Sequence, residues 1–205
     1  MINMNINDRY INELPDKHKI GYLEYMKGIY NIYDWGSHQP LTIHLLNTIE
    51  DGDVLEFGMG DNSTPIFNCI CKNQKKNLIS IDFDFEWFNK FTQYQSDLHK
   101  LLYLDVDLFK SQKYDFLNQH YSIMFVDAAP AWTRPMVIEL MKNNVDYIIA
   151  HDTTDIANGG KEGPNSGYGY HFSSFKHIHH FKKVSRTTTL ISNLDNIHPD
   201  ILKIF

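Results

Sequence analysis

The stretch "DGDVLEFGMGDNSTPIF", Asp51 to Phe67, decides how the chain is expected to fold. A short apolar run, "DVLEFG", ends at Gly58, and a second glycine, Gly60, follows two residues later. Small polar residues then lead into a stretch that is typical of a helix. A strand, a glycine turn and a helix in this order are typical of a site that grips a nucleotide-type cofactor.

The same alternation of strand and helix continues along the chain. Apolar runs predict four further strands, at residues 77–82, 100–105, 121–127 and 145–152, and helical spacing predicts helices at 19–33, 40–49, 64–73, 86–95 and 134–144. Continuous apolar runs are expected for parallel strands that are covered on both faces. Two later runs, 181–186 and 188–193, predict an antiparallel edge. The sequence therefore predicts an α/β fold: a doubly wound, Rossmann-like, mostly parallel seven-stranded sheet with helices on both faces.

The 205 residues are expected to form a single domain. Residues 1–50 are interpreted as helices that close over the cofactor, residues 51–152 as the cofactor-binding core, and residues 153–205 as a substrate loop and edge strands. The loop begins with "TTDIANGGKEGPNSGYG", which is longer and richer in glycine than most structural connections.

Composition excludes several classes of partner. The formal net charge is -6, so a nucleic-acid partner is not expected. No apolar run approaches the roughly 20 residues that span a bilayer, and the polar N-terminus does not look like a signal peptide. Cys69 and Cys71 stand two apart on a predicted helix and are not expected to pair. We therefore expect an intracellular, reducing, cytoplasmic location and no membrane partner.

Acidic residues stand at the carboxyl ends of all five predicted parallel strands. They are Glu56, Asp82, Asp105, Asp127 and Asp152. Open parallel sheets bind their ligands outside the carboxyl ends of the strands, near the point where the strand order reverses. These acids are therefore the first candidates for a functional site.

The details of the glycine turn favour a cationic ligand. A dinucleotide-binding turn has a third glycine where this chain has Ser63, and Glu56 would oppose a phosphate but suit a sulfonium or ammonium group. Asp82 lies 22 residues after Gly60, where a carboxylate can accept hydrogen bonds from ribose hydroxyls. Phe83 is interpreted as covering adenine, and Asp105 as accepting from its amino group. These features favour S-adenosylmethionine over NAD.

The segments "DVLEFGMG", "LISIDFD", "IMFVDAAP" and "YIIAHDTT" follow one another between about Trp35 and Asp152, and they resemble the successive motifs of class I S-adenosylmethionine-dependent methyltransferases. "WGSHQPL" and "HDTTD" are similar to segments of small bacterial and viral enzymes of this family that accompany glycan genes. For a viral protein the location would be the host cytoplasm. The resemblance implies that the cofactor is held by Glu56, Gly58, Gly60, Asn62, Ser63, Thr64 and Asp82. It also makes Trp35, Ser37 and His38 candidates for closing over the cofactor.

The resemblance further implies an O-methyltransferase that acts on a small molecule or on a sugar or glycan. A sugar hydroxyl is a poor acid, so a base or a metal ion is needed. The catalytic candidates are Asp127, His151 and Asp152, and the base could be His151, His38 or Asp127 itself. Asp127 and Asp152 could also hold Mg²⁺ or another divalent cation, as in catechol-type enzymes. The chain departs from that pattern at Thr153, where those enzymes have asparagine, and at Pro130, near which they have a lysine.

Aromatic and basic residues after the fourth strand are candidates for the acceptor site. Trp132 and Arg134 are interpreted as a substrate wall, and Tyr168, Tyr170 and His171 as the closing edge of the long loop. "HIHH", residues 177–180, is interpreted as a solvated helix end. Few residues remain outside the core, so contacts in a homo-oligomer could complete the site. The alternatives left open are a nitrogen acceptor, a NAD-binding oxidoreductase and a non-catalytic binding subunit.

Overall fold

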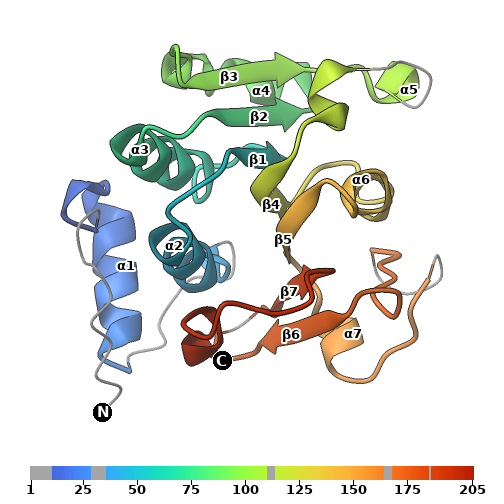
Figure 1. Cartoon of the computed structure of the whole chain (residues 1–205). Helices are drawn as coiled ribbons and strands as arrows, with labels where there is room; N and C mark the ends of the chain where they lie inside the picture. The colour runs from blue at the N-terminus through green and yellow to red at the C-terminus, as the bar shows by residue number, and fades with distance from the viewer. Residues whose placement is uncertain (1–10, 29–35, 110–113, 164–167, 185) are drawn as a thin grey trace.

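The computed structural model describes residues 11–28, 36–109, 114–163, 168–184 and 186–205. These residues form a seven-stranded sheet in the order β3-β2-β1-β4-β5-β7-β6, with helices on both sides (Figure 1). The strands are β1 Val54–Phe57, β2 Leu78–Asp82, β3 His99–Tyr103, β4 Tyr121–Val126, β5 Val145–Ala150, β6 His177–Phe181 and β7 Thr188–Ser192. The predicted mostly parallel, Rossmann-like sheet is confirmed.

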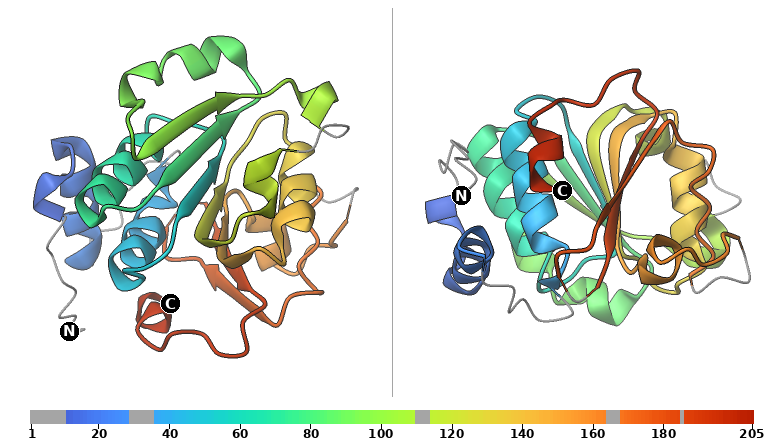
Figure 2. Two further views of the ribbon diagram at one scale, coloured as in Figure 1. Left: turned by 45° about the horizontal axis from the view of Figure 1, so that its top comes forward. Right: turned by 90° about the horizontal axis from the view of Figure 1, so that it is seen from below.

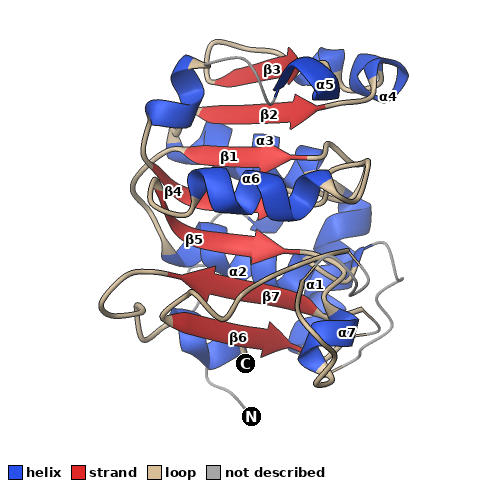
Figure 3. Ribbon diagram, turned by 90° about the vertical axis from the view of Figure 1, so that its right-hand side faces the viewer, coloured by secondary structure: helices blue, strands red, loops and turns tan. Residues whose placement is uncertain are grey.

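Five strands are parallel, and the last two form the antiparallel edge. β1 pairs in parallel with β2 and β4, and the same direction continues to β3 on one side and β5 on the other. β7 runs against both β5 and β6 (Figure 3). The strand order reverses between β1 and β4, so the carboxyl ends of these two strands flank the expected ligand crevice.

Seven α-helices among the described residues accompany the sheet. They are α1 Asp16–Met26, α2 Gln39–Thr48, α3 Thr64–Gln74, α4 Phe85–Asn89, α5 Val106–Phe109, α6 Thr133–Met141 and α7 Thr154–Ala157. The view from below shows α1, α2 and α3 on one side of the sheet and α6 on the other (Figure 2). Of the described helices, none has the length and apolar character needed to cross a bilayer.

Strand alternation divides the apolar residues between two cores. Val54 and Phe125 face the side of α2 and α3, where they pack with Leu45 and Phe67. Their strand neighbours Leu55 and Val126 face the opposite side, with Val137 of α6 and Phe109 of α5. Both faces of the central strands are therefore buried, which explains why these strands read as continuous apolar runs.

Three predicted elements differ in the structure. "HIHH" belongs to strand β6 and is not a helix end, and residues 182–184 follow that strand, so the predicted strand at 181–186 is displaced. The helix predicted at 86–95 divides into α4 and a 3₁₀ turn at Thr92–Tyr94, between which Phe91 turns into a small core with Met59 and Leu101. The helix predicted at 19–33 begins earlier, at Asp16, and ends at Met26; residues 29–35 lie outside the described part of the chain.

Candidate functional site

A cavity of about 670 Å³ lies at the carboxyl edge of the sheet. Most of its lining comes from three places: residues 59–63 in the turn after β1, Trp87 in α4, and the residues that follow β4 and β5. His38, Tyr168 and Arg186 complete it. The turn and the ends of β4 and β5 contain most of the residues singled out from the sequence. Those that line the cavity are His38, Gly60, Asn62, Ser63, Asp127, Arg134, His151, Asp152 and Tyr168.

Gly58 allows the end of β1 to pass close to the end of β4. Its φ is +93°, and a Cβ at this position would lie 2.5 Å from backbone atoms of Asp127 and Ala128. Any side chain would therefore force the two strand ends apart. Gly60 contributes differently: it lines the cavity, and its backbone N–H donates to Thr64 Oγ1 at 3.0 Å.

Glu56 lies in the core beneath the turn. Its side chain is 0% exposed, its carboxyl group accepts from the Thr64 hydroxyl at 3.1 Å, and one carboxyl oxygen lies 2.5 Å from the Ser80 hydroxyl oxygen. Burial raises the pKa of Glu56 to about 7, in spite of the hydroxyls that bond to it. Glu56 is buried and does not line the cavity, so its contact with a cationic ligand stays a prediction. Through Thr64, which is itself fully buried, Glu56 instead supports the backbone at Gly60.

A buried chain of hydrogen bonds continues from Glu56 to helix α3. The Ser80 hydroxyl also lies 2.8 Å from His99 Nε2, and His99 Nδ1 lies 3.1 Å from Asn68 Oδ1. Burial lowers the pKa of His99 to about 4, so its imidazole is neutral at physiological pH. With Nδ1 donating to Asn68, Nε2 accepts the single hydroxyl proton of Ser80. The short contact between Ser80 and Glu56 then needs a proton from Glu56, in agreement with its raised pKa.

Asp82 braces the turn from strand β2. Its Oδ2 accepts from the Met59 N–H and its Oδ1 from the Asp84 N–H, both at 2.9 Å. Burial raises the pKa of Asp82 to about 6. Trp87 adds a second tie, because its indole N–H donates to the Met59 carbonyl at 2.6 Å. Met59 is therefore held from both sides.

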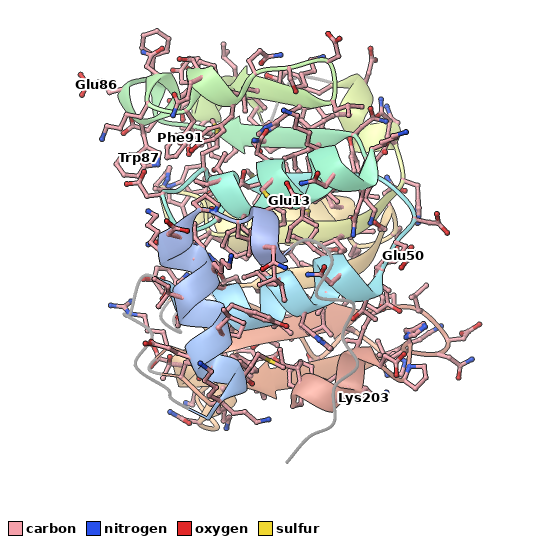
Figure 4. The ribbon with its side chains drawn as sticks, turned by 90° about the vertical axis from the view of Figure 1, so that its left-hand side faces the viewer. Glu13, Glu50, Glu86, Trp87, Phe91 and Lys203 are labelled. Carbon is pink, nitrogen blue, oxygen red and sulfur yellow. The ribbon has the colours of Figure 1, made fainter. Side chains whose placement is uncertain are left out.

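Trp87, and not Phe83, lines the cavity beside the glycine turn. Phe83 is buried against Phe57 and Phe109, with ring centroids 6.3 and 5.3 Å away, and does not line the cavity, so its contact with adenine stays a prediction. Trp87 lines the cavity and lies with Phe91 at the end of the sheet opposite Glu50 (Figure 4). Asp105 also does not line the cavity: it is exposed, and its carboxylate caps α5 by accepting from the N–H groups of Asp107 and Leu108, so its contact with adenine stays a prediction.

The end of β5 explains how two adjacent residues reach the cavity. Strand β5 ends at Ala150, and Asp152 has a left-handed φ of 58°. The strict alternation of a strand therefore no longer applies, and His151 and Asp152 both line the cavity. His151 Nδ1 lies 3.2 Å from Asp127 Oδ2 and 3.9 Å from Asp152 Oδ1. The three catalytic candidates thus meet at one point.

Arg134 joins the two carboxylates. One terminal nitrogen of its guanidinium lies 2.7 Å from Asp127 Oδ1, and the other lies 3.2 Å from Asp152 Oδ2. Its Nε donates to the Ala128 carbonyl at 2.9 Å, and the ring of Tyr168 stacks on the guanidinium at 4.3 Å. Although burial acts to raise the pKa of Asp152, His151, Arg186 and Arg134 together lower it below its ordinary value.

The other three candidates for the acceptor site do not line the cavity. Trp132 is 44% exposed and precedes α6 as its N-cap residue, while Arg134, two residues later, lines the cavity. Tyr170 is buried, and its hydroxyl donates to the His151 carbonyl at 2.7 Å, so it supports β5 from below. His171 is exposed and lies 3.3 Å from Glu162. Of this group, only Arg134 and Tyr168 are placed to meet a ligand.

Residues before the sheet complete the cavity. Ser37 is fully buried, and its hydroxyl lies 3.0 Å from His151 Nε2. His38 lines the cavity, with its ring 4.8 Å from that of His151 and its Nε2 3.1 Å from the Asn62 carbonyl. Burial, followed by the neighbouring His151, lowers the pKa of His38 to about 3. Trp35, the third candidate in this segment, lies outside the described residues.

The acids that could hold a metal ion are already paired with cations. Asp127, His151 and Asp152 could offer ligand atoms within 4.8 Å of one another. However, Arg134 contacts one oxygen of each carboxylate, and Arg186 lies 3.1 Å from the second oxygen of Asp152. Only Asp127 Oδ2, beside His151, remains outside these three ion pairs. The residues as arranged therefore do not fit a divalent cation.

Comparisons with solved structures agree with this fold. An O-methyltransferase from Bacillus cereus, solved with S-adenosylhomocysteine, superposes with a TM-score of 0.55 at 11% identity, covering 91% of this chain and 96% of that one. Human methyltransferase-like protein 13, also solved with S-adenosylhomocysteine, gives 0.54 at 15% identity, with 82% and 90% covered. A Streptomyces achromogenes O-methyltransferase of tomaymycin synthesis, solved with S-adenosylmethionine, gives 0.51 at 12% identity, with 86% and 87% covered.

Sequence comparison adds no closer relative. No family model matches the chain, and no curated protein matches it. The chain therefore shares the fold of S-adenosylmethionine-dependent methyltransferases, among them O-methyltransferases.

Proposed function

We propose that this protein is a methyltransferase that moves a methyl group from S-adenosylmethionine to a hydroxyl group of a small molecule or sugar. The observation that carries the proposal is the shared cavity. It joins the glycine turn and Trp87 to a cluster of acid, base and guanidinium groups at the ends of β4 and β5. Such a cavity has room for a cofactor and a small acceptor side by side.

The chain's own residues divide into two groups in this proposal. Gly60, Asn62 and Trp87 would contact the cofactor from the turn and from α4, while Glu56 and Asp82 position the turn from below. When bound, S-adenosylmethionine supplies an electrophilic methyl carbon on a sulfonium. The protein's task is then to align the acceptor oxygen with that carbon and to remove the hydroxyl proton.

His151 is the proposed general base, and its Nδ1 is the proposed proton acceptor. Among the described residues this nitrogen has no hydrogen-bond partner, because its contact with Asp127 lacks hydrogen-bond geometry. If Nε2 carries the proton and donates it to Ser37, Nδ1 keeps its lone pair. This nitrogen is buried, so the acceptor hydroxyl would have to reach it from the side of Asp127, which lines the cavity. Asp127 would then stabilise the imidazolium. His38 is a weaker candidate because its pKa is lowered, and Asp127 because Arg134 pairs with it.

In the proposed reaction the acceptor oxygen forms a bond to the methyl carbon as the carbon–sulfur bond breaks. The hydroxyl proton would pass to His151 Nδ1, and the sulfonium charge would be lost with the methyl group, which would leave S-adenosylhomocysteine with an uncharged sulfur. No step is assigned to Mg²⁺ or another divalent cation, because the two carboxylates are paired with arginines. A sugar or glycan is the proposed acceptor class, with a lone small molecule as the simplest case.

The test is transfer of a labelled methyl group from S-adenosylmethionine to a panel of sugars, phenols and amines. A hydroxylated acceptor is expected to be labelled, and His151→Asn is expected to slow transfer by about 10²–10⁴-fold, the usual contribution of a general base. His120→Asn is the matched control, since His120 is exposed at the amino end of β4 and pairs with Asp146. Labelling of amines alone would contradict the proposed acceptor, and full activity of His151→Asn would contradict the proposed base.

A further inference from the structure

The two carboxylates at the ends of β4 and β5 are bridged by one side chain from α6. Arg134 reaches Asp127 at 2.7 Å and Asp152 at 3.2 Å with its two terminal nitrogens. A planar guanidinium can bind two carboxylates at once in this way, whereas a lysine would act as a single point charge. The bridge is therefore specific to arginine.

Arg134 is also fixed in place. It is 7% exposed, its Nε donates to the Ala128 carbonyl at 2.9 Å, and Tyr168 stacks on its open face at 4.3 Å. A side chain held by its backbone contact, its two ion pairs and a ring has little freedom to move aside. A cation that entered between Asp127 and Asp152 would have to displace it.

The charges at this point already balance. Two carboxylates face two guanidinium groups, since Arg186 lies 3.1 Å from the second oxygen of Asp152. A divalent cation would add two positive charges beside two arginines, at a site where burial strengthens repulsion. Two acids that converge at neighbouring strand ends can otherwise hold such a cation. The difference here is the arginine between them.

We propose that the Arg134 guanidinium is a built-in cation, which occupies the position of a divalent metal between Asp127 and Asp152. In this role Arg134 is a positioning residue: it holds Asp127 so that its second oxygen stays beside His151 Nδ1, 3.2 Å away. Only the positioning role of Arg134 in catalysis rests on the proposed function. The exclusion of a metal ion stands on the ion pairs alone.

The experiment measures binding of Mn²⁺ by electron paramagnetic resonance, without cofactor or acceptor. The wild type is expected to bind no Mn²⁺ at this pair, so its titration should match that of Asp127→Asn. Arg134→Met is expected to gain a site with a dissociation constant below about 1 mM, at the weak end of the range for oxygen-ligand sites. The double variant Arg134→Met/Asp127→Asn is expected to lose it again.

Arg186→Met is the matched control. The same substitution there frees one oxygen of Asp152 but leaves the bridge intact, so no Mn²⁺ site is expected. Binding of Mn²⁺ by the wild type that disappears in Asp127→Asn would overturn the proposal. A folded Arg134→Met that binds none, or an Arg186→Met that binds equally well, would also overturn it. If Arg134→Met does not fold, the comparison of wild type with Asp127→Asn still shows whether the wild type binds Mn²⁺ between Asp127 and Asp152. Because no methyl acceptor is used, failure here is distinct from failure of methyl transfer.

Discussion

Replacing Glu56 by glutamine is expected to stabilise the protein at pH 8 far more than at pH 5. Glu56 is fully buried beneath the glycine turn and touches the hydroxyls of Thr64 and Ser80. A glutamine amide can donate to Ser80 and accept from Thr64, as a protonated carboxyl group would. The substitution therefore mimics the protonated state and removes the possibility of ionisation.

The magnitude follows from the pKa of Glu56, which burial raises from 4.5 to about 7. Between these values the folded protein binds a proton that the unfolded chain has lost. The free energy of unfolding of the wild type therefore falls as the pH rises through this window, and it levels off above about pH 7. A shift of about 2.5 pKa units corresponds to about 3 kcal/mol. Most of this cost is absent at pH 5 and present at pH 8.

Urea denaturation of the wild type and Glu56→Gln at both pH values measures the effect. The free energy of unfolding of the variant, relative to wild type, is expected to rise by about 2–3 kcal/mol between pH 5 and pH 8. The difference between the two proteins removes the contribution of Asp82, whose pKa is also raised. Glu50→Gln, the same change at an exposed glutamate, is the control. If wild type and Glu56→Gln differed in free energy of unfolding by the same amount at both pH values, the raised pKa of Glu56 would be refuted.

Three further predictions concern the turn, the core and the cavity. Gly58→Ala is expected to abolish binding of S-adenosylhomocysteine in a calorimetric titration, or to prevent folding. Gly159 has a similar φ of +84°, but a Cβ there would have no atom within 4 Å, so Gly159→Ala should retain binding. The Phe125 side chain is 0% exposed, so Phe125→Ala should lower the free energy of unfolding, measured by urea denaturation, by about 3–5 kcal/mol. Leu140 is 49% exposed, so Leu140→Ala should change it by less than about 0.5 kcal/mol. Trp87→Ala should weaken binding of S-adenosylhomocysteine by about tenfold, which corresponds to about 1.4 kcal/mol of lost binding free energy. Trp132→Ala should leave the binding unchanged. Equal effects of the two substitutions would contradict the placement of Trp87 on the cavity.

The fold was predictable because its signals are repeated and local. Each parallel strand is a short apolar run with an acid within two residues of its carboxyl end, and the carboxyl ends of parallel strands lie at one edge of a sheet. This is enough to bring Asp127, His151 and Asp152 together, as the structure shows. The antiparallel edge was predicted with its first strand displaced, because β6 carries polar histidines at 177, 179 and 180 and lacks a continuous apolar pattern.

The roles of single side chains were harder to predict, because they depend on where each side chain points and on partners that are far away in the sequence. Glu56 reads as part of a turn, yet it lies on the strand and points into the core, where Ser80 from the next strand meets it. Phe83 and Trp87 are four residues apart, and only the three-dimensional position of α4 decides which of them reaches the cavity. Arg134 was predicted as a substrate contact, but its two carboxylate partners, Asp127 and Asp152, could not be predicted from the sequence. "FDFEW", residues 83–87, contains three aromatic residues close to Asp82, and Trp87 could have been considered as a cofactor contact beside Phe83.

A calorimetric titration of the wild type with S-adenosylhomocysteine, followed by the same titration of Asp82→Ala, tests directly whether the glycine turn binds the methyl donor. We expect micromolar binding by the wild type and a marked loss in the variant, because Asp82 accepts from the Met59 N–H of the glycine turn at 2.9 Å. Absence of binding to the wild type, with heat released on addition of NAD instead, would contradict the proposed methyltransferase.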